Sequence, residues 1–355
     1  MTGGGSEVTD GSAKLSRRVK LIAIGRILLV LAPWAFIAYL FRDVDTTLDT
    51  FRDASVAPMV GALLLMLLVL AAMALLWVRL VAHLNREVAE PETPHLLRAF
   101  ARSWLARYLP GKMWVYGARV IHTDPTVTPR RIVASSLVDE IALILGTATA
   151  LGLGLWTWAV AGAMVGVPVL LAGLAVVAVA VSRLHQLKQL MLRLLGRVTP
   201  QRWNSAREGL ERAADDPGLG LMASVLFTAG YSLANLASGL VFVLLVVSLD
   251  GIESREILLL VGGYNLAAVI GVLAVFAPAG LGVREAILVG FLTPVVASPV
   301  AASIAVTLRA VTIVADILFV GLVEIASAFQ RRGAGREGAS ATGAHRRAGC
   351  RGPAD

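Results

Sequence analysis

The residues with the clearest capacity for chemistry are ionisable side chains that stand inside long apolar runs. Asp139 and Glu140 lie in one such run, and Arg309 and Asp316 lie in another, seven positions apart. Seven residues are nearly two helical turns, so Arg309 and Asp316 share one helix face. They could pair with each other, or across a bundle with Asp139 or Glu140. Charges inside a membrane cost roughly 2.5–3.5 kcal/mol each on insertion scales, so they either fix helix register or form a functional site.

Two interruptions rich in proline and glycine follow apolar runs at corresponding places, in residues 109–119 and 276–285. Their helix-breaking residues are Pro110, Gly111, Pro278, Gly280 and Gly282. At membrane depth such irregular backbone survives only inside protein or beside a water-filled cavity, and transporters use it to aim helix ends at a substrate. A helix that restarts at Val283 would point free N–H groups into the second break, beside Arg284, which suits a phosphate. The alternative is that both are ordinary loops that end helices.

These features predict a binding site for a lipid phosphate or headgroup. Its predicted members are Arg107, Lys112, Arg119, Arg284, Glu285 and Arg309. The intramembrane acids Asp139, Glu140 and Asp316 would balance these charges or bind a cationic headgroup. Asp316 or Glu140 would carry protons if an ion gradient drives transport. Tyr264 and Asn265 are weaker candidates, which hydrogen bonds between helices would explain equally well.

The elements that must position these residues are membrane helices. The chain of 355 residues is 57% hydrophobic and 16% charged, whereas a soluble domain is about 25% charged. The runs that predict crossings are 20–40, 57–82, 132–155, 157–182, 219–249, 256–277, 283–297 and 300–328. The run 283–297 is short, so a re-entrant half-helix is an alternative to a full crossing. The amphipathic segment 95–108 would lie on an anionic inner leaflet, with Trp104, Tyr108, Trp114 and Tyr116 at the headgroup level.

The charges between the runs predict the topology. Every second connection is rich in lysine and arginine, which marks the cytoplasmic side, and two of the others are acidic. Both termini are therefore expected in the cytoplasm, with eight helices in two four-helix halves. We expect an all-α polytopic protein of the cell membrane. Residues 1–19 and 329–355 would be disordered, and residues 20–328 would form the transmembrane domain.

Several other classes of protein are not indicated. Cys350 is the single cysteine, and the five histidines are dispersed, so neither a disulfide nor a metal site is predicted. The sequence contains no catalytic triad and no nucleotide-phosphate motif, so we expect no cofactor. The net charge of +8 is explained by the basic loops, and we expect no nucleic-acid partner.

Residues 276–285 (Phe-Ala-Pro-Ala-Gly-Leu-Gly-Val-Arg-Glu) closely resemble the signature of the lysylphosphatidylglycerol synthase transmembrane-region family, also called flippase-like. Residues 107–112 (Arg-Tyr-Leu-Pro-Gly-Lys), with Gly117 and Arg119, are similar to the family's earlier motif. The resemblance covers roughly residues 20–330 and implies an inner-membrane protein that moves or handles lipid-linked species. The bifunctional synthases carry a further aminoacyl-transferase domain, which we expect to be absent here.

Three functions remain open from the sequence. The first is a flippase for a phospholipid or a lipid-linked envelope precursor, which would be a transporter rather than an enzyme. The second is a membrane glycosyltransferase that uses a polyprenyl-phosphate donor, with Asp43 and Asp45 as its acidic pair. The third is a non-catalytic accessory protein of envelope assembly with protein partners. The expected ligands are anionic phospholipids or polyprenyl-phosphate-linked lipids.

Overall fold

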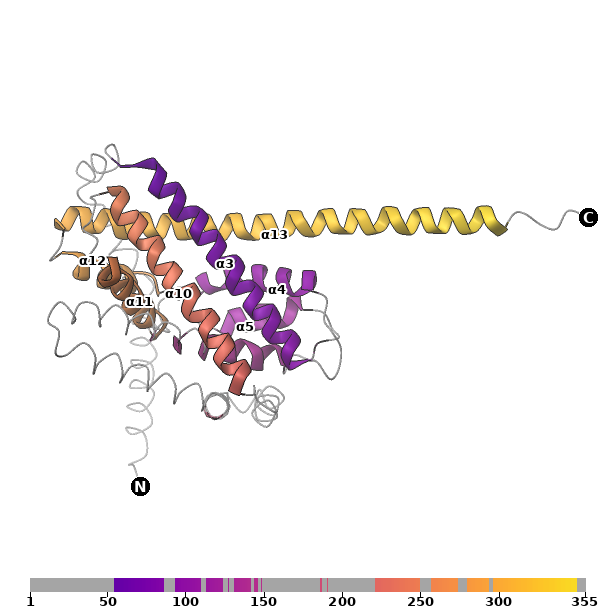
Figure 1. Ribbon diagram of the computed structural model, residues 1–355, viewed down its shortest axis with the longest axis horizontal. Helices are drawn as coiled ribbons and strands as arrows, with labels where there is room; N and C mark the ends of the chain where they lie inside the picture. Colours follow the sequence, from indigo (N-terminus) through magenta and orange to yellow (C-terminus); the bar gives the residue numbers. More distant parts are fainter. Residues whose placement is uncertain are drawn as a thin grey trace, which may run out of the picture.

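The elements of the structure are helices throughout the described part of the chain (Figure 1). The computed structural model describes residues 54–85, 93–109, 113–123, 131–141, 221–249, 257–273, 280–293 and 296–349, with a few isolated positions between 127 and 190. The named elements are α3 (Val56–Leu84), α4 (Thr93–Leu105), η1 (Ala106–Tyr108), α5 (Met113–His122), α10 (Leu221–Leu249), α11 (Ile257–Leu273), α12 (Val283–Leu292) and α13 (Ser298–Gly349). Residues 131–141 form a further helix.

Among the described residues, three helices are long and apolar enough to cross a membrane: α3, α10 over Met222–Leu249, and α13 over Pro299–Gln330. They correspond to the predicted runs 57–82, 219–249 and 300–328. The predicted runs 20–40 and 157–182 lie outside the described residues, so the count of eight crossings and the two halves stay predictions. Each long helix buries one side and leaves another apolar side exposed, as lipid requires.

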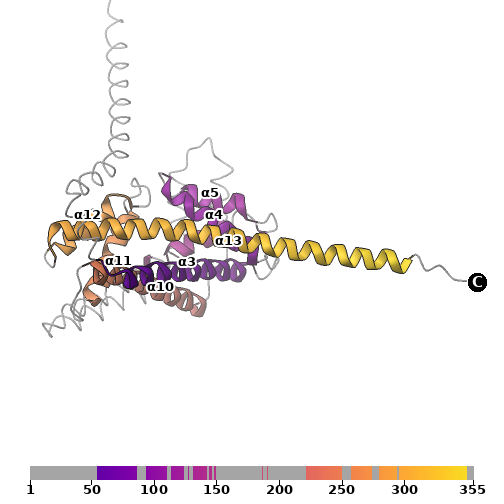
Figure 2. The same cartoon turned by 90° about the horizontal axis from the view of Figure 1, so that it is seen from above.

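Helices α3 and α10 lie side by side as an antiparallel pair, and Figure 2 shows them on the side of α13 opposite α4 and α5 (Figures 1 and 2). At one end the Ser55 N–H donates to the Ser248 carbonyl at 2.8 Å. Further along, Gly230 lies directly against the side chain of Leu76, which lets the two helices approach closely. This pair supplies the scaffold against which α4, α11 and α13 pack.

Helix α4 packs inside the bundle instead of resting on a leaflet with its apolar side in lipid. Its buried side, which includes Leu96 and Phe100, lies against α3, α5 and α13. The amphipathic pattern of residues 95–108 therefore predicts a helix correctly, but the apolar side of that helix packs against protein. Hydrophobic periodicity alone does not distinguish these two partners, because both offer an apolar surface.

Helix α12 begins at Val283, the residue at which the sequence predicts a restart, and contains ten residues. A helix of that size is about 15 Å long, roughly half the hydrocarbon core of a bilayer. It does not cross a membrane by itself, so its length favours the re-entrant alternative for residues 283–297.

At its other end, α13 continues to Gly349 as one helix (Figure 1). The sequence predicts a disordered tail from residue 329. Residues 331–349 contain five alanines and five arginines, which favour a helix, but also five glycines, which disfavour one, so intrinsic propensity does not account for the continuation.

The turn into α12 depends on glycine. Gly280 and Gly282 have φ angles of +68° and +79°, a region that side-chain-bearing residues rarely adopt. A Cβ on Gly280 would also lie 3.2 Å from the Cα of Gly271 in α11. Backbone geometry and close packing therefore both require glycine at position 280. Pro278, Pro110 and Gly111 lie outside the described residues.

We expect Gly280→Ala to lower the unfolding free energy by about 1–3 kcal/mol, the usual cost of a strained backbone conformation. Gly290→Ala is the matched control, because Gly290 lies inside α12 and a Cβ there would meet nothing within 4 Å. That control should be neutral or stabilising by up to about 1 kcal/mol. Thermal unfolding of both purified variants in detergent checks the pair. Equal unfolding temperatures for Gly280→Ala and the unaltered protein would contradict the assignment.

Candidate functional site

A fully buried carboxylate, that of Asp316, lies close to the midpoint of the apolar part of α13, Pro299–Gln330. The Trp104 Nε1–H donates to its Oδ1 at 3.0 Å, and the Tyr108 hydroxyl donates to its Oδ2 at 2.6 Å. The Arg107 Nη2 lies 3.5 Å from the same Oδ2. Both carboxylate oxygens are therefore engaged by groups from the end of α4 and from η1.

A second ion pair lies two turns away on the same face of α13. The Arg309 Nη1 is 3.6 Å from Oε1 of Glu285 in α12. The other oxygen of Glu285, Oε2, accepts a hydrogen bond from the Gly282 backbone N–H at 2.7 Å, which caps α12. The Arg309 guanidinium also lies 5.5 Å from the centre of the Tyr108 ring. Tyr108 thus contacts one member of each ion pair, Asp316 and Arg309.

Arg284 completes this arrangement at the first turn of α12. Its guanidinium carbon lies 4.4 Å from the centre of the Tyr264 ring in α11, a cation–π distance. Its Nε and Nη2 are buried, and neither has a hydrogen-bond partner in the described part of the chain. We call the whole set the Asp316 cluster: Trp104, Arg107, Tyr108, Tyr264, Arg284, Glu285, Arg309 and Asp316.

The first hairpin, α4–η1–α5, brings its tip to this cluster from one end of α13. In α4, Arg102 forms two hydrogen bonds with Glu324, at 2.5 and 3.0 Å, near the Gln330 end. Phe100 packs edge-on against Phe319, and the last turn reaches Asp316. At the end of α5, His122 interacts electrostatically with Glu324. Arg102 and the end of α5 therefore lie near Glu324, and the tip of the hairpin lies near the middle of α13.

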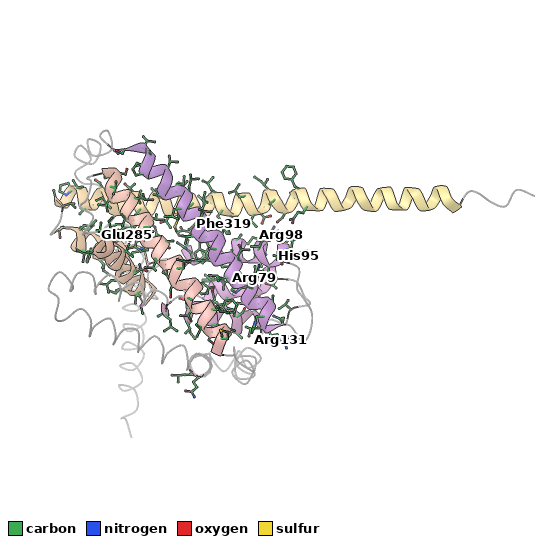
Figure 3. All side chains as sticks on the ribbon, in the orientation of Figure 1. Arg79, His95, Arg98, Arg131, Glu285 and Phe319 are labelled. Atoms are coloured by element: carbon green, nitrogen blue, oxygen red, sulfur yellow. The ribbon has the colours of Figure 1, made fainter. Side chains whose placement is uncertain are left out.

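The second hairpin, α11–α12, approaches from the opposite end. Gly263 lies against the ring of Phe291 and Gly271 lies against Gly280, so the two helices run antiparallel. Its tip presents Arg284 and Glu285 near Arg309, while α12 leads back toward the start of α13. In Figure 3, Glu285 lies on one side of the bundle and Arg98 and His95 of α4 lie on the other. The two tips meet between Arg309 and Asp316.

A separate polar group lies on the other side of α4. The Arg119 Nη1 in α5 is 2.9 Å from Oδ2 of Asp139, and the Tyr231 hydroxyl of α10 donates to the other oxygen. All three residues are buried, and the Arg119 guanidinium lies 4.8 Å from the Trp77 ring. We call Arg119, Asp139 and Tyr231 the Asp139 cluster. It holds the first hairpin against the helix of residues 131–141 and against α10.

The two clusters are joined by aromatic rings of α4. The Arg119 guanidinium lies 5.0 Å from the Phe100 ring, and Phe100 stacks on Trp104 with centroids 5.2 Å apart. A shift of α4 would therefore disturb both groups together.

The structure gathers Arg107, Arg284, Glu285, Arg309 and Asp316 in one place, and pairs Arg119 with Asp139 in another. Glu140 is partly exposed next to Asp139, and Lys112 lies outside the described residues.

The pairing partners differ from those expected. The structure pairs Arg309 with Glu285 and Asp316 with Arg107. Helix spacing places Arg309 and Asp316 on one face, but it does not reveal which neighbouring helices cover that face. Asn265 hydrogen-bonds the Val261 and Asn235 carbonyls, so it has the interhelical role considered for it.

The sequence reading missed two donors to Asp316. Trp104 and Tyr108 were expected at the headgroup level, but both point inward and hydrogen-bond the buried carboxylate. Trp114, from the same group, is 58% exposed. The available signal was their spacing, because residues 100, 104 and 108 follow one another at intervals of four, which places them on one side of a helix.

Comparison with known proteins identifies the family of the chain. Residues 22–319, most of the chain, match the family described as lysylphosphatidylglycerol synthase TM region. A search of curated proteins found no match.

Proposed function

This chain belongs to the lysylphosphatidylglycerol synthase transmembrane-region family, and on that basis we propose that it translocates or handles a phospholipid or a lipid-linked envelope precursor. The family and the apolar helices establish a membrane protein. The observation that carries the proposal is the Asp316 cluster, a buried group of charges halfway along a helix long enough to span. Such charges are costly in a bilayer and are usually retained where a polar substrate must pass.

The arrangement of the two hairpins suits movement of a headgroup between leaflets. A flippase must give a polar head a path while the acyl chains stay in lipid. Two broken-helix hairpins that enter from opposite ends and meet at one site could open alternately, as broken helices do in transporters. On this proposal, the Arg102–Glu324 pair helps to close the site toward the Gln330 end of α13.

A lipid-movement assay in proteoliposomes tests the proposal. Acyl-labelled fluorescent lipids with different headgroups are incorporated, and a membrane-impermeant reductant reports which molecules reach the outer leaflet. We expect the unaltered chain to move at least one phosphate-containing lipid faster than protein-free liposomes. Arg79→Gln, at an exposed position on α3, is the control and should leave the rate unchanged. No acceleration for any anionic, zwitterionic or polyprenyl-phosphate lipid would refute the proposal.

A further inference from the structure

We propose that Arg284 binds the phosphodiester of a lipid headgroup that carries one negative charge and no ammonium group. This inference rests on the proposed function, because it names the substrate class of the same site. Three features support it: the unpartnered Nε–H and Nη2–H of Arg284, the net charge of the Asp316 cluster, and the partners that Glu285 and Asp316 already have.

The first argument is the geometry of Arg284. Nε–H and Nη2–H point from the same edge of a guanidinium, and this edge binds two oxygens of one carboxylate or phosphate group. In Arg284 these are the two buried donors without a partner in the described part of the chain. The Tyr264 ring, 4.4 Å from the guanidinium carbon, restrains its plane. A buried donor without a partner is energetically unfavourable, so a ligand with two paired oxygens would gain by binding there.

The second argument is charge. Among its described residues, the cluster has three guanidinium groups, those of Arg107, Arg284 and Arg309, and two carboxylates, those of Glu285 and Asp316. One positive charge is left in excess. A phosphodiester carries one negative charge and neutralises that excess. A phosphomonoester carries about −1.5 to −2 at neutral pH, so it would leave negative charge without a partner.

The third argument excludes a cationic head. An ammonium group inside a membrane needs an acidic partner. Both oxygens of Asp316 are taken by Trp104, Tyr108 and Arg107. Of the two Glu285 oxygens, Oε1 is ion-paired with Arg309 at 3.6 Å and Oε2 accepts a hydrogen bond from the Gly282 N–H. An ammonium group would therefore have to compete with the guanidinium that each carboxylate of the cluster already pairs with, whereas a singly charged anionic headgroup needs no carboxylate.

Lipid binding to the full chain tests this inference without requiring transport. The purified protein in detergent is titrated with four dioleoyl lipids, and binding is followed by native mass spectrometry. The lipids are phosphatidylglycerol, phosphatidylethanolamine, lysylphosphatidylglycerol and phosphatidic acid. We expect phosphatidylglycerol to bind at least tenfold more tightly than each of the other three.

Arg284→Lys keeps the charge but removes the paired donors, so it should reduce that preference to threefold or less. Arg79→Gln, on the exposed side of α3, should leave the preference unchanged. Tyr264→Leu removes the ring that supports the Arg284 guanidinium, so it should also weaken the binding of phosphatidylglycerol. If Arg284→Lys does not remain monodisperse, the ranking of the four lipids by the unaltered protein still decides the charge argument.

Three results would overturn the inference: equal binding of phosphatidylglycerol and phosphatidylethanolamine, tighter binding of lysylphosphatidylglycerol or phosphatidic acid, or full preference in a folded Arg284→Lys variant. Selective binding without movement in proteoliposomes would instead refute the flippase proposal and leave this site standing. Movement of lipids without a binding preference for phosphatidylglycerol would refute this inference and leave the flippase proposal standing.

Discussion

Asp316→Asn is expected to abolish lipid movement and to lower the unfolding free energy by about 3–5 kcal/mol, the usual cost of breaking a buried ion pair. The side chain of Asp316 is fully buried, and its loss of charge leaves Arg107 without its counter-ion near the middle of the bundle. The hydrogen bonds from Trp104 and Tyr108 would also weaken, because they would no longer end on a charged acceptor. Chemical unfolding in detergent and the proteoliposome assay measure the two effects.

Glu324→Gln is the control for stability on the same helix. Its partner is Arg102, and the two side chains are 37% and 43% exposed, so the pair should contribute only about 0–1 kcal/mol. A loss for Asp316→Asn as small as that for Glu324→Gln would show that the buried pair does not hold the hairpin tip. Unchanged lipid movement in Asp316→Asn would separate this residue from the proposed site.

Asp139→Asn should lower the unfolding free energy by a similar amount, about 3–5 kcal/mol, because it leaves the buried Arg119 unpaired. Replacing both partners by apolar residues, Arg119→Met with Asp139→Leu, should recover much of that loss. Tyr231→Phe removes only the hydrogen bond to the carboxylate and should cost about 1.5–3 kcal/mol. Chemical unfolding of the unaltered protein and of these three variants under one condition measures the differences.

The Asp139 cluster is a positioning group in this account, so its variants should keep the preference for phosphatidylglycerol while they remain folded. A folded Asp139→Asn protein that no longer distinguishes phosphatidylglycerol from phosphatidylethanolamine would place Asp139 in the binding site. A double variant less stable than Asp139→Asn would show that Arg119 contributes through its packing on Trp77 and Phe100 more than through its charge.

The sequence was most informative where one residue type has one physical use. Asp139, Arg309 and Asp316 stand out in the sequence as charged residues within apolar runs. Because hydrocarbon excludes unpaired charges, such residues are expected to have buried partners. The density of glycine and proline identified the turn before α12, and Gly280 and Gly282 do have positive φ angles there. The apolar runs also gave the extents of α3, α10 and α13 to within a few residues, apart from the helical extension of α13 beyond residue 328.

The sequence could not give the partners of these residues. Asp316 is bound by Tyr108, which is 208 positions away, and Asp139 is bound by Tyr231, which is 92 positions away. Such contacts depend on the tilt and rotation of each helix, which packing against neighbours decides. For the same reason, the sequence did not predict the partner of α4, because an apolar helix side has the same pattern whether it faces lipid or protein. It also explains Trp104 and Tyr108, since aromatic residues near basic ones are equally typical of a membrane interface.

The depth of the first hairpin in the bilayer decides whether the Asp316 cluster lies at mid-membrane, because its tip carries Arg107 and Tyr108 to Asp316. With Cys350→Ser as background, single cysteines at Thr93, Leu109 and Ile121 take a nitroxide label in proteoliposomes. All three positions are exposed, and Leu109 follows Tyr108 at the tip. Power-saturation measurements compare collisions with oxygen, which concentrates in hydrocarbon, and with a water-soluble nickel chelate. We expect the label at Leu109 to lie near the bilayer centre, and those at Thr93 and Ile121 to lie near the interface. Equal, interfacial depths at all three positions would show that α4 and α5 lie along the membrane surface, and would contradict a cluster at mid-membrane.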